Sequence, residues 1–323
     1  MILTVEQIKK ILYGAIEYNI TEDSYIHPLR FTQQQIATLG KLRKDWGEKA
    51  YATSGICFDF YTNSSIFAFD AKITPATTRF FYYFDLFTDG ILTHHEGAEK
   101  YDKMAEKHIE FHLSEGRHRI TVWFPNLNCA VIKNVTVDDE SEITPYAHSA
   151  KMLALGDSIT QGYDAVYSCL SYPNIVAMER GYELVNQGIG GLNLQPESIA
   201  DYGGYNPDIV SVAFGTNDWN VKTREAFERD CVNVYDAIKR EFPTQTIYAI
   251  MPIWRGDTNR LSKCGDFTDT CNFLRSVAKE RGCIIIEGIN ATPHHPDFYS
   301  DKIVHPNDIC FKFYGDYVLK TLK

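Results

Sequence analysis

The period of the apolar residues changes near residue 140, and this change constrains the fold more than any other feature of the sequence. Over residues 14–137, short apolar runs rich in Phe, Tyr and Thr alternate with turn sequences such as Asp89-Gly90. Many short strands at this spacing predict a β-sandwich or jelly roll, and Asp-Gly between apolar runs is typical of a hairpin turn. A capping-box pattern before the strands predicts a short helix at residues 5–13.

After the polar stretch at 138–142, apolar runs alternate with amphipathic segments of helical length. This order predicts a parallel sheet with helices on both faces, and 323 residues are enough for two domains. We expect an all-β sandwich accessory domain with a short N-terminal helix at residues 1–145, and an α/β domain at residues 146–323. The strands of the second domain are expected at 151–155, 183–186, 209–214, 246–251 and 283–287, and its helices near 169–180, 223–241, 266–281 and 307–321.

The formal charge of the chain is −10, from 32 basic and 42 acidic residues. This balance disfavours nucleic acids and anionic membranes as partners, because both attract basic patches. Neither a signal segment nor an apolar run near the ~18 residues of a membrane span is visible, so the sequence predicts a cytoplasmic protein. Removal of a signal beforehand would leave secretion open. The eight cysteines include no Cys-x-x-Cys pair, and we expect reduced core thiols.

Polar residues follow the expected strands at the edge of the sheet where ligand sites gather. Ser158 stands where the first strand ends and a helix begins, so its hydroxyl either caps the helix or acts as an exposed nucleophile. A late loop carries Asp301 and His305. A serine hydroxyl becomes a good nucleophile when an imidazole takes its proton, and a carboxylate fixes the tautomer of that imidazole. The sequence therefore offers Ser158, His305 and Asp301 as catalytic residues.

Hydrogen-bond donors for a tetrahedral oxyanion are expected at three strand ends. They are the backbone amides of Ser158 and Gly188 and the side-chain amide of Asn217. Trp219 and Trp254 also follow strand ends, and they form either an aromatic wall for a sugar or acyl group or part of the core.

No metal or cofactor is expected. His294 and His295 are adjacent, but no cysteine or acidic ligand stands at a recognisable spacing from them. The chain has no Gly-x-Ser-x-Gly, no Walker A sequence and no complete dinucleotide-binding fingerprint.

The second half of the chain contains four short motifs, Gly156-Asp157-Ser158, Gly188 within Asn-x-Gly-x-x-Gly, Gly215-Thr216-Asn217-Asp218 and His305-Pro306. They stand in the order of the signature blocks of the GDSL/SGNH hydrolases, and this half of the chain resembles that family. The resemblance implies a flavodoxin-like three-layer α/β/α domain of an esterase or lipase, with Ser158 as nucleophile and His305 as base. It also implies that Gly188 and Asn217 are oxyanion donors. The preceding sandwich resembles the jelly roll of two-domain carbohydrate esterases.

The last motif departs from the family pattern, which reads Asp-x-x-His. Here Lys302 occupies the usual aspartate position, and Asp301 lies four residues before His305. Either Asp301 still reaches the imidazole, or a Ser-His dyad operates with a backbone carbonyl orienting the histidine.

The sequence thus predicts a metal-independent serine ester hydrolase that acts through an acyl-enzyme. The resemblance suggests removal of small acyl groups, acetyl above all, from carbohydrates. A lipase or lysophospholipase, a thioesterase and a non-catalytic carbohydrate-binding protein are the alternatives. The expected partner is a small-molecule or oligosaccharide ester, and the sequence does not indicate an oligomeric state.

Overall fold

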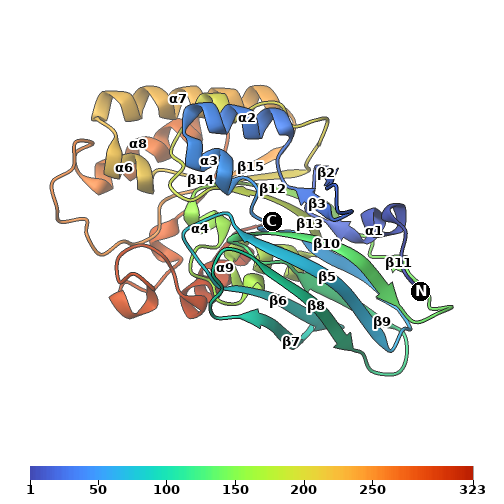
Figure 1. Cartoon of the computed structure of the whole chain (residues 1–323). Helices are drawn as coiled ribbons and strands as arrows, with labels where there is room; N and C mark the ends of the chain where they lie inside the picture. The colour runs from blue at the N-terminus through green and yellow to red at the C-terminus, as the bar shows by residue number, and fades with distance from the viewer. Residues whose placement is uncertain (323) are drawn as a thin grey trace.

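Two antiparallel sheets and one parallel sheet make up the protein in the computed structural model, which describes residues 1–322 (Figure 1). The antiparallel sheets form a sandwich from the first half of the chain, and the parallel sheet belongs to the second half. The predicted α/β fold with a preceding sandwich is therefore confirmed. Among the described residues, no helix combines the length and the apolar character needed to cross a membrane.

The sandwich follows helix α1 (Val5–Ile11), which Thr4 and Gln7 start with the expected capping box. Apolar side chains from both sheets meet in one core that is rich in phenylalanine. One sheet has the order β1-β4-β9-β6-β7 with β11 beside β4, and the other has the order β2-β3-β10-β5-β8. The strands are β1 (Leu12–Tyr13), β2 (Glu17–Ile20), β3 (Ile26–Leu29), β4 (Cys57–Thr62), β5 (Ile66–Pro75), β6 (Tyr82–Thr88), β7 (Ile91–Ala98), β8 (Ala105–His112), β9 (His118–Trp123), β10 (Asn128–Val137) and β11 (Thr144–Pro145).

The predicted hairpin turn at Asp89-Gly90 is confirmed. It joins β6 to β7, and both residues have positive φ, 50° and 82°, as a two-residue hairpin turn of this kind requires.

Two helices that the sequence reasoning did not anticipate interrupt the sandwich strands. They are α2 (Gln33–Leu42) and α3 (Lys44–Lys49), and they lie beside the parallel sheet (Figure 1). Thr32 and Gln35 form a capping box at the start of α2, the same Thr-x-x-Gln pattern that starts α1. The first half of the chain therefore contributes two helices to the core of the second.

The parallel sheet has the order β13-β12-β14-β15-β16, which is the flavodoxin-like order 2-1-3-4-5. Helices α5 and α9 cover one face of it, and α7 and α8 cover the other together with α2 and α3. The elements are β12 (Ala150–Gly156), α4 (Ser158–Gln161), α5 (Tyr172–Arg180), β13 (Tyr182–Gly188), β14 (Ile209–Ala213), α6 (Thr216–Val221), α7 (Arg224–Glu241), β15 (Thr246–Ile250), α8 (Phe267–Glu280), β16 (Ile284–Ile286) and α9 (Asp308–Thr321), with four short 3₁₀ turns at Ser168–Leu170, Pro196–Ser198, Gly288–Asn290 and Pro296–Phe298.

The register of the parallel sheet brings three strand ends together. Gly156 at the end of β12 pairs with Gly188 on one side and with Ala213 on the other. The loops that leave β12, β13 and β14 consequently start at one edge, where the candidate site lies. The chain leaves the sandwich between β11 and β12, the segment that contains the proposed division at residues 145–146.

Candidate active site

Ser158 is the first residue of α4, and a single residue, Asp157, separates it from the end of β12. The helix cap is provided by Asp157, whose Oδ1 accepts a hydrogen bond of 2.9 Å from the amide of Ile159. Burial raises the pKa of Asp157 to about 7. Because Asp157 caps the helix, the Ser158 hydroxyl is not needed for that purpose, and within the described part of the chain the Ser158 amide has no acceptor.

A chain of hydrogen-bonded side chains starts at Ser158. Its Oγ lies 2.9 Å from Nε2 of His305, and Nδ1 of the same ring lies 2.8 Å from Oδ2 of Asp301. The structure thus brings together the three residues that the sequence offered as catalytic. With this geometry the imidazole can accept the serine proton while the carboxylate holds the other ring nitrogen.

The loop between Asp301 and His305 accommodates the extra residue by folding around the carboxylate. Oδ1 of Asp301 accepts hydrogen bonds from the amides of Ile303, Val304 and His305 at 2.9, 2.8 and 3.1 Å. Lys302 takes a left-handed φ of 63° to close this turn. Desolvation of the carboxyl acts to raise its pKa, but the His305 hydrogen bond and these amides outweigh it and hold the pKa of Asp301 well below its usual range.

One side chain of the sandwich half, Arg79, reaches the surroundings of this site through Tyr163 of the α/β half. The ring of Tyr163 lies 5.4 Å from the His305 ring, and the guanidinium of Arg79 lies 5.1 Å from the centre of the Tyr163 ring. Arg79 is held by Asp164 through an ion pair with a shortest distance of 2.5 Å. Sequence reasoning missed Arg79 and Tyr163, because nothing in the local sequence connects the loop after β5 with the segment after α4.

The predicted oxyanion donor Gly188 is placed differently from expectation. Its amide donates a hydrogen bond of 2.9 Å to Oδ1 of Asn186, so this N–H already has an acceptor. A Cβ on Gly188 would lie 2.3 Å from the backbone nitrogen of Gln161. The glycine is therefore needed for the close approach of β13 to α4, and its amide is not free for an oxyanion.

Gly191, three residues further along the same loop, has the free amide that Gly188 lacks. No acceptor for its N–H is found in the described part of the chain, and its φ is 82°. Nδ2 of Asn217 donates a hydrogen bond of 2.9 Å to the carbonyl of Leu192, which ties this loop to α6. The Gly190-Gly191 pair could have pointed to this position, because a positive φ beside a ligand is a common use of glycine.

The two tryptophans have different surroundings. Trp219 is 0% exposed and donates from Nε1 to the carbonyl of Gly265, and the guanidinium groups of Arg255 and Arg260 lie 4.7 and 4.4 Å from the centre of its ring. It belongs to the core, so the alternative of an aromatic wall is wrong for this residue. The half-buried Trp254 packs against Tyr299 with 4.8 Å between ring centres and remains a candidate substrate contact.

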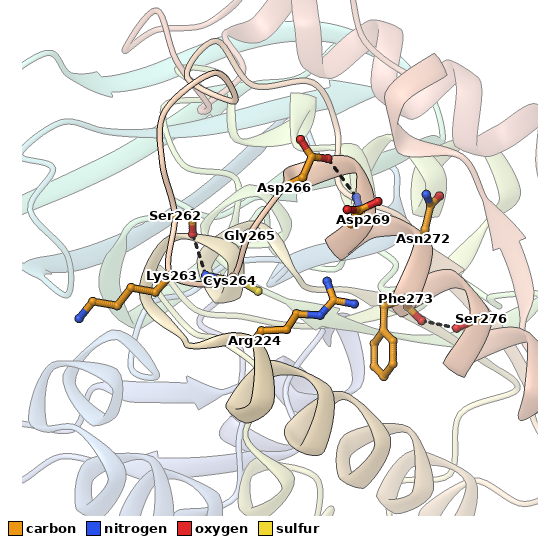
Figure 2. A pocket seen from close by; sticks show the side chains of 10 residues that line it. All are labelled: Arg224, Ser262, Lys263, Cys264, Gly265, Asp266, Asp269, Asn272, Phe273 and Ser276. Atoms are coloured by element: carbon orange, nitrogen blue, oxygen red, sulfur yellow. Dashed lines mark hydrogen bonds between the residues drawn. The ribbon is translucent and has the colours of Figure 1, made fainter.

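A separate cavity of about 620 Å³ opens between Arg224 at the start of α7, helix α8 and the loop at residues 262–266 (Figure 2). Figure 2 shows Asp266 and Asp269 near one another, the Arg224 side chain extending toward Asp269 and Asn272, and the Lys263 side chain pointing away from the group. None of the predicted site residues lines this cavity. The described residues contain no group of three His, Cys, Asp or Glu side chains that could hold a metal ion.

A flavodoxin-like sheet with a paired serine and histidine at its carboxyl edge is the arrangement of a carboxylic ester hydrolase domain. Residues 154–309 match the model of the GDSL-like Lipase/Acylhydrolase family, and this part of the chain is a domain of that family. The resemblance to GDSL/SGNH hydrolases is thereby confirmed. No relative among the curated proteins matches the chain.

Solved structures with both halves of this architecture are similar in fold over nearly the whole chain. A salicylyl-acyltransferase from a tetracycline biosynthetic pathway has a TM-score of 0.79 and 17% identity, covering 96% of this chain and 93% of its own. A GDSL-like lipase from Bacteroides ovatus has a TM-score of 0.70 and 15% identity, covering 98% and 95%. A family two carbohydrate esterase from Clostridium thermocellum, in complex with cellohexaose, has a TM-score of 0.63 and 16% identity, covering 96% and 97%.

Proposed function

We propose that this protein cleaves small acyl esters through an acyl-enzyme formed on Ser158. The observation that carries the proposal is the continuous hydrogen-bonded chain from Ser158 Oγ through His305 to Asp301, with distances of 2.9 and 2.8 Å. In the first step Ser158 Oγ attacks the ester carbonyl carbon and His305 Nε2 takes the hydroxyl proton. The alcohol leaves with that proton, and a water molecule activated by the same imidazole then cleaves the acyl-enzyme.

The oxyanion of each tetrahedral intermediate is proposed to accept hydrogen bonds from Ser158 N, Gly191 N and Asn217 Nδ2. The amides of Ser158 and Gly191 have no acceptor among the described residues. One N–H of Asn217 Nδ2 donates to the carbonyl of Leu192. A primary amide has a second N–H, which can donate to the oxyanion. Asp301 is proposed to hold the His305 tautomer, which favours the triad over the dyad.

The acyl group is proposed to be acetyl and the alcohol a carbohydrate. The sandwich-plus-α/β architecture is that of the family two carbohydrate esterase with a TM-score of 0.63, which supports this substrate class. The amide of Gly256 donates a hydrogen bond of 2.8 Å to the carbonyl of Ile303, so the segment that begins with Trp254 runs beside the Asp301 loop. The indole of Trp254 there offers an apolar face for a sugar ring.

Hydrolysis of 4-nitrophenyl acetate by wild type and Ser158→Ala tests the reaction. We expect Ser158→Ala to lose at least ~10³-fold in kcat, and the exposed-serine control Ser276→Ala to match wild type. Equal rates for wild type and Ser158→Ala would support the non-catalytic alternative. A panel of acetylated sugars and of esters with longer acyl chains tests the substrate. A preference for long acyl chains would favour a lipase, and a preference for thioesters a thioesterase.

A further inference from the structure

Helix α3 from the first half of the chain contacts the loop that carries the proposed oxyanion donor. Nζ of Lys49 donates a hydrogen bond of 2.8 Å to the carbonyl of Gly190 and pairs with Asp45 Oδ2 at 2.8 Å. The Lys49 side chain is only 13% exposed. A Cβ on Gly191 would point toward Trp46 of the same helix, 3.8 Å from its Nε1. Helix α3 therefore covers the Gly190-Gly191 segment.

The carbonyl that Lys49 binds and the N–H of Gly191 belong to one peptide group. A peptide group is planar, so a hydrogen bond that fixes its carbonyl also fixes the direction of its N–H. This restraint matters between two glycines, because neither residue has a side chain that limits rotation of the group. The preceding peptide group is fixed separately, since Gly190 N donates to Oε1 of Gln161 at 2.7 Å.

The ammonium also changes the strength of the donor. A carbonyl that accepts a hydrogen bond from a cation becomes more polarised, and the N–H of the same peptide group then donates more strongly. We propose that Lys49 is a positioning residue for the acyl-transfer reaction, which directs and polarises the Gly191 N–H toward the oxyanion. The inference rests on the proposed function and gives the first half of the chain a part in catalysis.

The test compares Lys49→Met with Lys44→Met on the same helix, where the Lys44 side chain is 92% exposed. We expect Lys49→Met to lower kcat for 4-nitrophenyl acetate ~10–100-fold with KM within ~2-fold, less than the loss of a whole oxyanion donor. Lys44→Met is expected to match wild type, and Lys49→Arg to recover part of the rate because it keeps a charged donor.

A second readout separates positioning from folding. Phenylboronic acid forms a tetrahedral adduct with the serine, so Lys49→Met should weaken its inhibition by about the factor lost in kcat. If circular dichroism shows that Lys49→Met does not fold, Lys49→Gln, which keeps a neutral donor, is expected to fold and to show the same two effects at smaller size. Unchanged kcat, or a change in KM alone, in a folded variant overturns the role of Lys49. A wild type without esterase activity overturns the proposed function instead.

Discussion

Replacement of Arg30 by methionine is expected to destabilise the protein strongly, although Arg30 has no acidic partner among residues 1–322. Its guanidinium is 0% exposed and donates only to backbone carbonyls. The acceptors are Ala52 at 2.7 Å, Lys49 at 3.0 Å, and Asn186 and Gly188 both at 2.6 Å. The last two lie two residues apart on the edge strand β13, so Arg30 satisfies carbonyls that no neighbouring strand can reach.

The magnitude follows from two opposing quantities. Hydrogen bonds from a charged donor contribute about 1.5–3 kcal/mol each, so four contribute about 6–12 kcal/mol. Against them stands the cost of burying the cation, which lowers the pKa of Arg30 from 12.5 to about 9. At about 1.4 kcal/mol for each pKa unit this shift corresponds to about 5 kcal/mol. The difference centres on about 4 kcal/mol, the expected fall in the free energy of unfolding for Arg30→Met.

Urea denaturation followed by tryptophan fluorescence measures this change. The control is Arg281→Met, since Arg281 pairs at 2.7 Å with Asp236, whose side chain is 55% exposed. Such a surface pair contributes less than about 1 kcal/mol. A loss below about 1 kcal/mol for Arg30→Met as well would refute the reasoning, because the four hydrogen bonds would then only balance the burial of the charge.

Three further predictions concern the site. Asp301→Asn should lower kcat about 10³–10⁴-fold by disturbing the His305 tautomer, and a rate close to wild type in the same ester assay would favour the dyad. Burial raises the pKa of Asp157 from 3.8 to about 7. Between these pH values the folded state keeps a proton that the unfolded state has lost, so the free energy of unfolding falls as the pH rises from about 4 to about 7. Asp157→Asn removes this titration, so its free energy of unfolding in urea melts should rise relative to that of wild type by up to about 4 kcal/mol between about pH 4 and pH 7. A difference in free energy between the two proteins that does not change with pH would contradict this. Gly188→Ala should lower kcat at least ~100-fold because its Cβ would lie 2.3 Å from Gln161 N, whereas Gly40→Ala, whose nearest neighbour is 4.0 Å away, should leave kcat unchanged.

The sequence predicted the second half of the fold well because its strands are continuous apolar runs. All five expected strands are present, and β12 differs from the expected 151–155 by one residue at each end. Buried parallel strands and amphipathic helices have different periods, so local pattern separates them. The same reasoning placed Ser158, His305 and Asp301 at loop positions that the structure brings together.

The parts that were missed depend on contacts distant in sequence. Whether a loop amide can donate to an oxyanion depends on whether a neighbouring acceptor already binds it. The amide of Gly188 donates to Oδ1 of Asn186, which the sequence alone does not reveal. Trp219 is buried in the core, where it packs against Phe267 and under Arg255 and Arg260, and spacing along the chain does not encode these contacts. Helices α2 and α3 were hidden by their short length within a strand-rich half, although the Thr32 capping box was readable.

The carbonyls around Arg30 also bear on the order in which the protein folds during its synthesis. Residues of the first half leave the ribosome first, and Arg30 then has only Ala52 and Lys49 as its acceptors. The carbonyls of Asn186 and Gly188 emerge more than 150 residues later. Until then the guanidinium stays hydrated, because a half-satisfied cation is costly to bury. The nascent first half therefore completes its packing only when β13 arrives, and a pause in translation before residue 186 would prolong the exposure of this surface.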